Sequence, residues 1–265
     1  MQRDVRAHLD ITVTEPAELV IAVAVSSHYE TAHERLTVTL DGAPVTVEEF
    51  HDHSGTRLHR IAVGTGALSL DYEARVDGRG ERAGADPYDL FVCRLPSRYV
   101  ESDVLSPTAA AEFAGITAAS DLLAAVSSWV GTRLAYVPGS SGPTDGAVQT
   151  MLGREGVCRD YAHLTAALLR AQGLPARVAA VYAPGLSPME FHAVAEAWID
   201  DAWRVVDATA LAPRQSLVRI ATGRDAADTA FLTVLSGRAS LDALEVTAVV
   251  DELPVDDVTQ LVELR

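Results

Sequence analysis

Apolar and polar residues alternate over short runs in the first third of the chain. In most of these runs apolar side chains recur at every second position and β-branched residues are frequent, as in strands with one buried face. Asp41-Gly42 stands between two runs and predicts a tight hairpin turn, because both residues tolerate positive φ. The predicted strands are 11–13, 19–25, 35–40, 45–47, 57–63 and 68–76. We therefore expect an antiparallel, β-sandwich-like N-terminal domain.

A segment rich in glycine and proline, 78–107, follows these strands and places a domain boundary near residue 100. Beyond it, apolar residues recur every three or four positions, which is typical of amphipathic helices. The predicted helices are 120–131, with Ser120 or Asp121 as its cap and Gly131 at its end, 145–152, and 158–172, closed by Gly173 and Pro175. Further predicted elements are a strand at 176–182, a hairpin of strands 191–199 and 203–206, and a last pair of strands, 244–250 with 258–264. The pattern indicates an α+β protein with two domains, 1–100 and 101–265.

Composition limits the partners of the protein. The chain has 265 residues, of which 48% are hydrophobic, so a sizeable core can form. Its net charge of -16 argues against binding to nucleic acids or to anionic membranes, which would repel it. No apolar run reaches the roughly 18 residues of a membrane span, and the first residues do not resemble a secretory signal. We expect a soluble, cytoplasmic protein; a homo-oligomer is compatible with the sequence, but no feature favours one.

One of the two cysteines, Cys158, lies at the start of a predicted helix in the stretch "GREGVCRDYAHL". Without an export signal, both cysteines are expected to be free thiols. The unpaired N–H groups and the dipole of a helix start stabilise an anion, so a thiolate there can act as a nucleophile. The alternative is a small side chain that fills the core.

A nucleophilic cysteine needs a histidine to carry protons and a third group to orient that histidine. His163 lies five residues further along the same helix and points roughly 140° away, so it cannot be the base. His192 opens a predicted strand. If a two-residue turn follows at 200–201, the hairpin register brings Asp207 to the face of His192, whereas a three-residue turn would move it to the other face. Asparagine is absent from the sequence, so the third group must be an aspartate.

The segments "GVCRDYAHLTAALLRAQGLPAR" and "FHAVAEAWIDDAWRVVDAT" resemble the transglutaminase-like superfamily, in particular a bacterial branch often described as cysteine proteases. The resemblance extends upstream through 95–103 and downstream through 223–228, so it covers most of the chain. It implies a papain-like transglutaminase core, in which the helix with Cys158 packs on an antiparallel sheet with His192 and Asp207. By this resemblance Cys158 is the nucleophile, His192 the general base and acid, and Asp207 the orienting carboxylate.

The resemblance also raises questions about the surroundings of the thiol. The family usually has tryptophan two residues after the histidine, where this chain has Val194. The backbone N–H of Cys158 is the natural first oxyanion donor, and the side-chain donor is left open among three residues. These candidates are Gln149, Tyr136 and Trp129, and the candidates for the substrate pocket are Val194, Tyr182 and Asp160.

Other residues that could carry chemistry have simpler interpretations beside the functional ones. Cys93 is expected to be structural, and no cofactor is implied. His51, His53 and His59 could hold zinc, but a solvated strand edge is favoured, so no metal site is expected. Asp225 and Asp228 near Arg224 could shape a cleft or form an exposed turn with an ion pair. The remaining pairs are Arg159 with Asp160, which could steer substrate or lie on the helix surface, and Trp198 with Trp203, expected in the hairpin core.

Three classes of function are therefore considered. The first is a cysteine hydrolase that cleaves amide bonds in a peptide or another amide-containing substrate through a thioester. The second is a transglutaminase or other acyltransferase, in which an amine captures the same thioester. The third is a non-catalytic interaction module, which would have no need of a cysteine, a histidine and an aspartate together.

Overall fold

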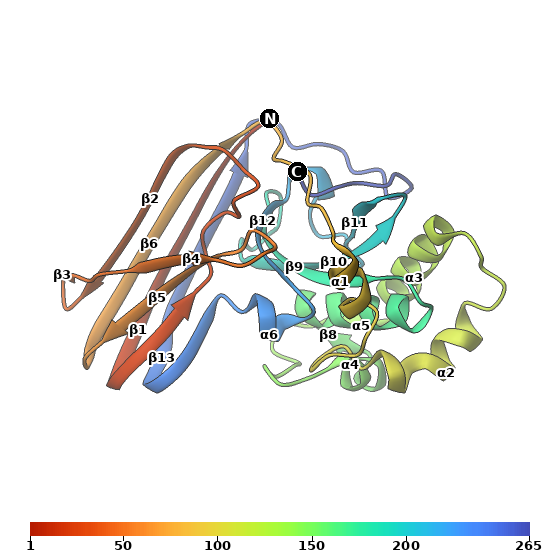
Figure 1. The fold of residues 1–265 in the computed structure, drawn as a ribbon, viewed down its shortest axis with the longest axis horizontal. Helices are drawn as coiled ribbons and strands as arrows, with labels where there is room; N and C mark the ends of the chain where they lie inside the picture. Colours follow the sequence, from red (N-terminus) through yellow and green to blue (C-terminus); the bar gives the residue numbers. More distant parts are fainter.

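The computed structural model describes all residues from 1 to 265. A β-rich part and a part with both helices and strands lie side by side (Figure 1). The strands are β1 (Gln2–Ile21), β2 (Thr31–Leu40), β3 (Ala43–Pro44), β4 (Glu48–His51), β5 (Arg57–Val63), β6 (Gly66–Asp77), β7 (Ala135–Tyr136), β8 (Glu155–Gly156), β9 (Ala176–Tyr182), β10 (Phe191–Ile199), β11 (Ala202–Val206), β12 (Val218–Gly223) and β13 (Leu232–Val250). The helices are α1 (Pro87–Val92), α2 (Ser102–Glu112), α3 (Ala119–Arg133), α4 (Ala147–Gly153), α5 (Cys158–Ala171), the 3-10 turn η1 (Arg214–Ser216) and α6 (Ala226–Thr229).

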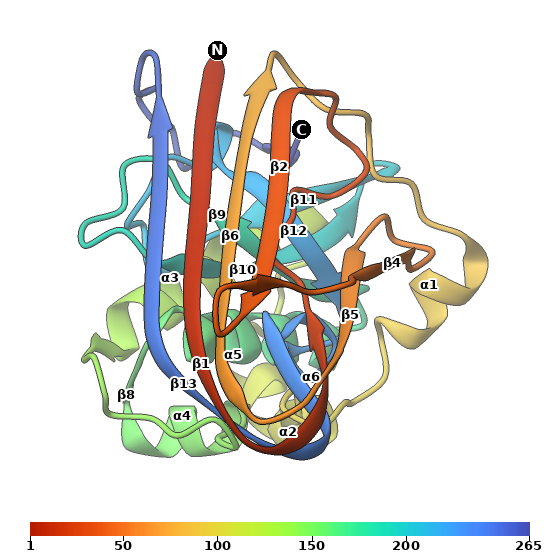
Figure 2. The same ribbon diagram turned by 90° about the vertical axis from the view of Figure 1, so that its left-hand side faces the viewer.

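The β-rich part is one antiparallel sheet of seven strands in the order β3-β2-β6-β1-β5-β4, with β13 paired to β1. Figure 2 shows β13, β1, β6 and β2 side by side. Side chains of β1 alternate between buried and accessible along the strand, with Val5, Leu9 and Ile11 among the buried ones. The predicted period of two is thus confirmed, and so is the turn at Asp41-Gly42, where φ is 49° and 80°.

The inner face of this sheet packs against the second part of the molecule. Its core cluster includes Tyr182 from β9 and Val218 and Ile220 from β12. These strands belong to a second antiparallel sheet, with the order β11-β10-β9-β12. Apolar side chains between the two sheets therefore join the β-rich part to the mixed part.

Helix α5 packs on the second sheet. Its apolar residues, including Leu164 and Leu168, form a core cluster with Ala195, Ala197 and Ile199 of β10. Helices α2, α3 and α4 in turn contact α5. The fold class is therefore α+β, and the predicted arrangement of a cysteine-bearing helix on an antiparallel sheet is confirmed.

Local signals placed the elements around this helix well, and three other predictions were wrong. α5, β9 and the β10–β11 hairpin lie where the pattern predicted them. Residues 45–47 do not form a strand but lie between β3 and β4. Gly131 does not end a helix: α3 continues to Arg133, and the missing side chain lets the carbonyl of Ala208 approach closely. Residues 244–250 and 258–264 do not pair with each other, because β13 pairs with β1 and the last segment forms only a bridge between Val262 and Val205.

The expected division into 1–100 and 101–265 stays a prediction. The segment 78–107, predicted to be a connector, contains α1 and the beginning of α2. β13, near the other end of the chain, pairs with β1 over most of its length, so the first sheet contains residues from both sides of residue 100. None of the helices has both the length and the apolar composition that crossing a membrane requires.

Candidate active site

Cys158 is the first residue of α5. Val157, which precedes it, is extended, with φ -111° and ψ -178°, and thus marks the start of the helix. Cys158 is partly accessible to solvent, whereas most residues of α5 are buried. The structure thus places a free thiol at a helix start with access from outside, as the sequence predicted for this position.

The β10–β11 hairpin has the two-residue turn, one of the two alternatives that the sequence left open. Ile199 pairs with Ala202, so the turn consists of Asp200 and Asp201 alone. Both turn residues have positive φ, 51° and 55°, as in the type I′ turns that suit two-residue hairpins. Because the turn has two residues rather than three, Asp207, which directly follows β11, lies on the same face of the hairpin as His192.

This register brings His192 and Asp207 together. The distance between His192 Nε2 and Asp207 Oδ2 is 2.8 Å, and the two residues are 2% and 8% exposed. A bond of this length between an imidazole and a carboxylate is charge-assisted when the ring is protonated. The ring is therefore held in one orientation, with Nδ1 available on its other side.

His192 and Asp207 each shift the pKa of the other toward its charged form. Burial alone would lower the pKa of His192, but the charge and hydrogen bond of Asp207, together with nearby Cys158, raise it to about 10. Burial would likewise raise the pKa of Asp207, but His192 and the donors of Thr209 lower it. Nδ1 of His192 is buried without a hydrogen bond of ordinary geometry, and Cys158 is the reactive group near it. A protonated imidazole there favours a thiolate by direct charge attraction.

Thr209 fixes the other oxygen of the aspartate, which sequence reasoning missed. Asp207 Oδ1 accepts hydrogen bonds from the Thr209 backbone N–H at 3.0 Å and from its hydroxyl at 2.6 Å. An aspartate with a threonine two positions later is the usual pattern of a turn closed by the aspartate side chain, so the signal was present. Both carboxylate oxygens of Asp207 are thereby occupied.

Of the three side-chain candidates for oxyanion donor, the structure brings Tyr136 to Cys158. Burial and the charge of Cys158 raise the pKa of Tyr136 to about 12, while a hydrogen bond with the Cys158 backbone acts in the opposite direction. Trp129 is engaged elsewhere, because its indole N–H donates to Glu112 at 2.8 Å. Gln149 is exposed on α4 and has no hydrogen bond with the other site residues.

The three residues expected to line a substrate pocket are buried, which corrects that expectation. Tyr182 lies in the core between the two sheets, and its hydroxyl donates to the carbonyl of Val23 at 2.8 Å. Val194 is 1% exposed and packs in a separate apolar cluster with Val205 and other residues. Asp160 is fully buried, and its carboxylate accepts a hydrogen bond from the backbone N–H of Val157.

His163 is placed as the helical geometry predicted, away from the thiol. Its Nε2 accepts a hydrogen bond from the Ala226 N–H at 3.1 Å, and its ring stacks on Tyr99. Burial lowers the pKa of His163 to about 3, so the ring is neutral. Asp225 caps α6 and also accepts the Tyr99 N–H at 2.9 Å.

A buried ionic group lies further along the strand that bears His192. Glu196 bonds with Arg177 at 2.8 Å and with Arg219 at 2.7 Å, and all three side chains are almost completely buried. Burial would raise the pKa of Glu196, but the two arginines lower it to about 2. Because each residue comes from a different strand, the group fixes β9, β10 and β12 to one another.

Of the three histidines considered for zinc, two contact the same carboxylate, Glu49, and the third pairs with a different residue. His51 pairs with Glu49 at 2.9 Å and His53 with Asp89 at 3.0 Å, while buried His59 lies 3.4 Å from Glu49. No three of the histidine, cysteine, aspartate and glutamate side chains in the structure are grouped as metal ligands.

The remaining residues singled out from the sequence have structural positions. Cys93 is buried beside Trp203, and burial raises the pKa of its thiol. Trp198 and Trp203 contact each other edge to face across the hairpin. Arg224 forms a two-bond ion pair with Asp228, 2.9 and 3.1 Å, on the surface. These positions match the simpler interpretations of Cys93, of the tryptophans and of the Arg224–Asp228 pair.

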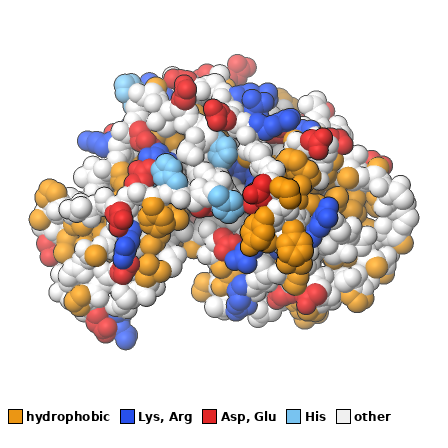
Figure 3. All heavy atoms as spheres, in the orientation of Figure 1, with side chains coloured by type: hydrophobic (Ala, Val, Ile, Leu, Met, Phe, Trp, Pro, Cys, Tyr) orange, Lys and Arg blue, Asp and Glu red, His pale blue; other side chains and the backbone are white.

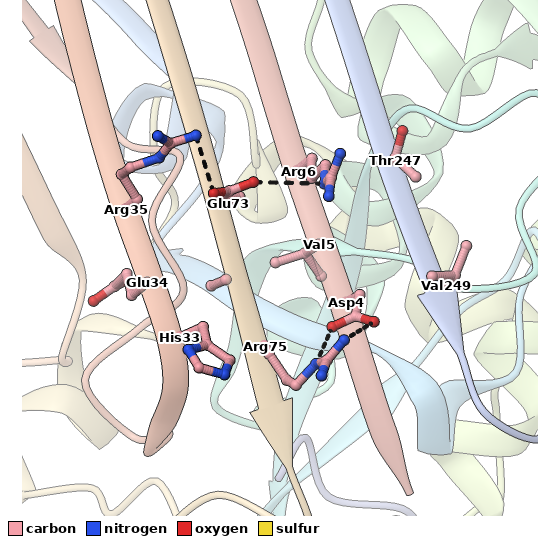
Figure 4. Close-up of a pocket in the computed structure, with 11 residues that line it drawn as sticks. Asp4, Val5, Arg6, His33, Glu34, Arg35, Glu73, Arg75, Thr247 and Val249 are labelled. Carbon is pink, nitrogen blue, oxygen red and sulfur yellow. Dashed lines mark hydrogen bonds and ion pairs between the residues drawn. The ribbon is translucent and has the colours of Figure 1, made fainter.

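A surface hollow of about 710 Å³ lies away from the thiol. It lies on the outer face of the seven-stranded sheet (Figure 4), where Arg75 bonds both carboxylate oxygens of Asp4. Glu73 pairs there with Arg35 at 3.2 Å and with Arg6 at 3.8 Å. These charged side chains pair with one another across neighbouring strands. The hollow is therefore lined by surface ion pairs.

On the face of the molecule in Figure 3, acidic and basic side chains are interspersed, and hydrophobic side chains gather where Figure 1 draws α1. Tyr88 and Phe91 of α1 are 66% and 57% exposed.

Comparisons with known proteins find similar sequences and a similar structure. The family described as the transglutaminase-like superfamily matches residues 107–208. The crystal structure of a candidate cysteine protease from Cytophaga hutchinsonii is similar over 98% of this chain and 96% of that chain, with a TM-score of 0.89 and 33% identity. A protein of unassigned function from Mycobacterium leprae is 29% identical over 130 residues, 44% of this chain and 46% of that protein. The match thus spans somewhat less than half the length of that relative.

A more distant likeness is found with the periplasmic domain of TgpA from Pseudomonas aeruginosa. It is 19% identical over 75% of this chain and 91% of that chain, with a TM-score of 0.43. At this level the likeness carries no argument about the chemistry of the site.

Proposed function

Because the chain belongs to the transglutaminase-like superfamily, we propose that it is a cysteine-dependent amide-bond hydrolase with Cys158, His192 and Asp207 as its catalytic residues. The observation that carries the proposal is the buried His192–Asp207 pair, 2.8 Å apart, beside a partly accessible thiol at a helix start. A thiol that only fills the core requires neither the histidine nor the aspartate.

In the first half of the reaction, the Cys158 sulfur attacks the carbonyl carbon of the amide and forms a C–S bond. The carbonyl oxygen takes up the negative charge, and the Cys158 N–H and the Tyr136 hydroxyl are the donors that we assign to it. His192 then gives a proton from Nδ1 to the amide nitrogen, the C–N bond breaks, and the amine leaves. Asp207 holds Nε2 throughout, so the ring keeps one orientation.

In the second half, a water molecule attacks the thioester carbon while neutral His192 accepts its proton at Nδ1. The C–S bond breaks, a carboxylic acid leaves, and the Cys158 thiolate and the protonated His192 are restored. A primary amine in place of water would give a new amide, which is the reaction of a transglutaminase. The thiol is partly accessible, so both water and an amine can approach it. Analysis of the reaction products distinguishes hydrolysis from acyl transfer.

The substrate class is a peptide or another molecule with an amide bond. A cytoplasmic location and the absence of nucleic-acid or membrane partners remain predictions from the charge and composition of the chain. The alternative is a non-catalytic interaction module, which would show no turnover in the test below.

The test compares the wild-type protein with Cys158→Ala and, as a matched control, Cys93→Ala. Cys93 is buried away from the site, so its replacement should leave turnover of peptide p-nitroanilides or glutaminyl peptides intact. Cys158→Ala should abolish turnover while unfolding as the wild type does. Mass spectrometry of the products with and without a primary amine then separates hydrolysis from acyl transfer. Turnover retained in Cys158→Ala would overturn the proposal.

A further inference from the structure

Asp160 is the third residue of α5, within its first turn, and is fully buried. Its Oδ2 accepts a hydrogen bond from the backbone N–H of Val157 at 2.8 Å and another from the hydroxyl of Ser141 at 2.5 Å. Its Oδ1 has no hydrogen-bond partner. A buried carboxylate is costly unless its bonds serve the structure around it, so the role of these contacts must be explained.

The two bonds join the residue before Cys158 to a loop that follows Tyr136. Ser141 belongs to that loop, and Arg159 reinforces the connection by donating to the Ser141 hydroxyl at 3.1 Å and to the Gly142 carbonyl at 2.9 Å. The loop is rich in glycine, serine and proline, so it has few apolar contacts of its own to hold it. Side chains of Arg159 and Asp160 therefore anchor it to the start of α5.

Asp160 also packs directly on the short strand before the helix. A Cβ atom added to Gly156 would lie 2.6 Å from the Cβ of Asp160, closer than side chains can approach. Gly156 pairs with Tyr136, and its carbonyl accepts the N–H of Val137 at 3.0 Å. Asp160 is thus in contact with the backbone on both sides of the site, next to Cys158 and next to Tyr136.

We propose that Asp160 is a positioning residue for the oxyanion site: its carboxylate fixes the backbone of Val157 and the loop after Tyr136, so that the Cys158 N–H and the Tyr136 hydroxyl face the same point. This inference rests on the proposed function. This role differs from the favourable interaction that any acidic residue in a first helical turn has with the helix dipole. That interaction does not fix the position of a particular backbone group.

The experiment separates two reactions of the same thiol. Acylation by p-nitrophenyl acetate places negative charge on a carbonyl oxygen, whereas alkylation by iodoacetamide occurs at a saturated carbon and forms no oxyanion. Loss of one oxyanion donor lowers kcat by about 10²–10³ in acyl-transfer enzymes, so a misplaced donor in Asp160→Ala should lower the acylation rate by about 10–100-fold. The KM and the alkylation rate should change by less than about threefold.

Three further variants keep the test decisive. Asp160→Asn retains an oxygen for the Val157 N–H and should recover part of the lost acylation rate. Ser141→Ala removes only the link to the loop, and should lower acylation about 3–10-fold even if Asp160→Ala does not fold. Asp121→Ala, at an exposed first-turn aspartate of α3, is the matched control and should leave both rates unchanged.

Equal losses of acylation and alkylation in Asp160→Ala, or in Ser141→Ala if only that variant folds, would show a general effect on the thiol and overturn the inference, as would no loss of either rate. Failure of the proposed function has a different signature. In that case the wild type is not acylated, or Cys158→Ala is acylated as fast as the wild type, and Asp160 has no oxyanion to position.

Discussion

Replacement of Asp207 by asparagine should change how the stability of the protein depends on pH. The variant keeps the shape of the side chain but removes the charge that faces His192 across 2.8 Å. In the wild-type protein the pKa of His192 is raised to about 10 against an ordinary value of 6.5, and that of Asp207 is lowered from 3.8. Without the carboxylate, burial dominates and the histidine loses its proton more easily.

The sign and size follow from these values. A raised histidine pKa contributes stability that is fully present below pH 6.5 and is lost as the pH rises toward about 10. A lowered aspartate pKa contributes stability above pH 3.8 that is lost as the pH falls. The rise of the histidine pKa corresponds to at most about 5 kcal/mol at about 1.4 kcal/mol per pH unit, and loss of one partner of a buried ion pair costs about 3–5 kcal/mol. The variant should therefore be less stable by about 3–5 kcal/mol between pH 4 and 6.5.

Urea unfolding from pH 4 to pH 10 measures this difference. Both proteins should carry Cys158→Ala, so that titration of the thiol does not enter. The deficit of Asp207→Asn should shrink above pH 6.5 with a slope of up to about 1.4 kcal/mol per pH unit. As a control, Asp228→Asn breaks the exposed pair with Arg224 and should cost less than about 1 kcal/mol. A deficit of constant size from pH 6.5 to 10 would refute the assignment of the raised pKa to Asp207.

Three further changes test contacts away from the thiol. Tyr182→Phe should lower the free energy of unfolding by about 1–3 kcal/mol, because it leaves the buried Val23 carbonyl without its donor; urea unfolding with no loss would contradict the hydrogen bond. Glu196→Ala should cost about 3–5 kcal/mol, because two buried arginines lose their counter-charge, and an unchanged unfolding midpoint would exclude their burial in the folded state. Gly156→Ala should lower the rate of Cys158-dependent acylation at least tenfold, because the new methyl group would displace Asp160; wild-type turnover by this variant would argue against the close packing.

The relation of His192 to Asp207 could be predicted because it depends on local signals. Alternation along β10 predicted the face of the histidine, and the turn at Asp200-Asp201 left two registers to consider, of which the structure has the one with a two-residue turn. The extent of α5 was likewise visible in the sequence, because apolar residues recur at helical spacing and Gly173 and Pro175 follow the end of the helix. Each of these inferences spans fewer than about 20 residues of chain.

Features that depend on distant segments could not be predicted in the same way. Alternation shows that Tyr182 has a buried face, but not that the other sheet covers it rather than substrate. The burial of Asp160 is a similar case, because a loop 19 residues earlier in the chain contributes Ser141 to its surroundings. Spacing alone also gave no sign that β13 pairs with β1, since antiparallel pairing leaves no mark on strands so far apart in sequence.

That long-range pairing has a consequence for the order in which the chain can fold. The partners Ile21 in β1 and Leu232 in β13 are separated by on the order of 200 residues, so closing this contact requires a very long loop. During synthesis β1 emerges first, and it can pair with β6 long before β13 leaves the ribosome. Until then one edge of β1 carries unpaired backbone groups and is open to other strands. The first strand to be made is among the last to be fully paired.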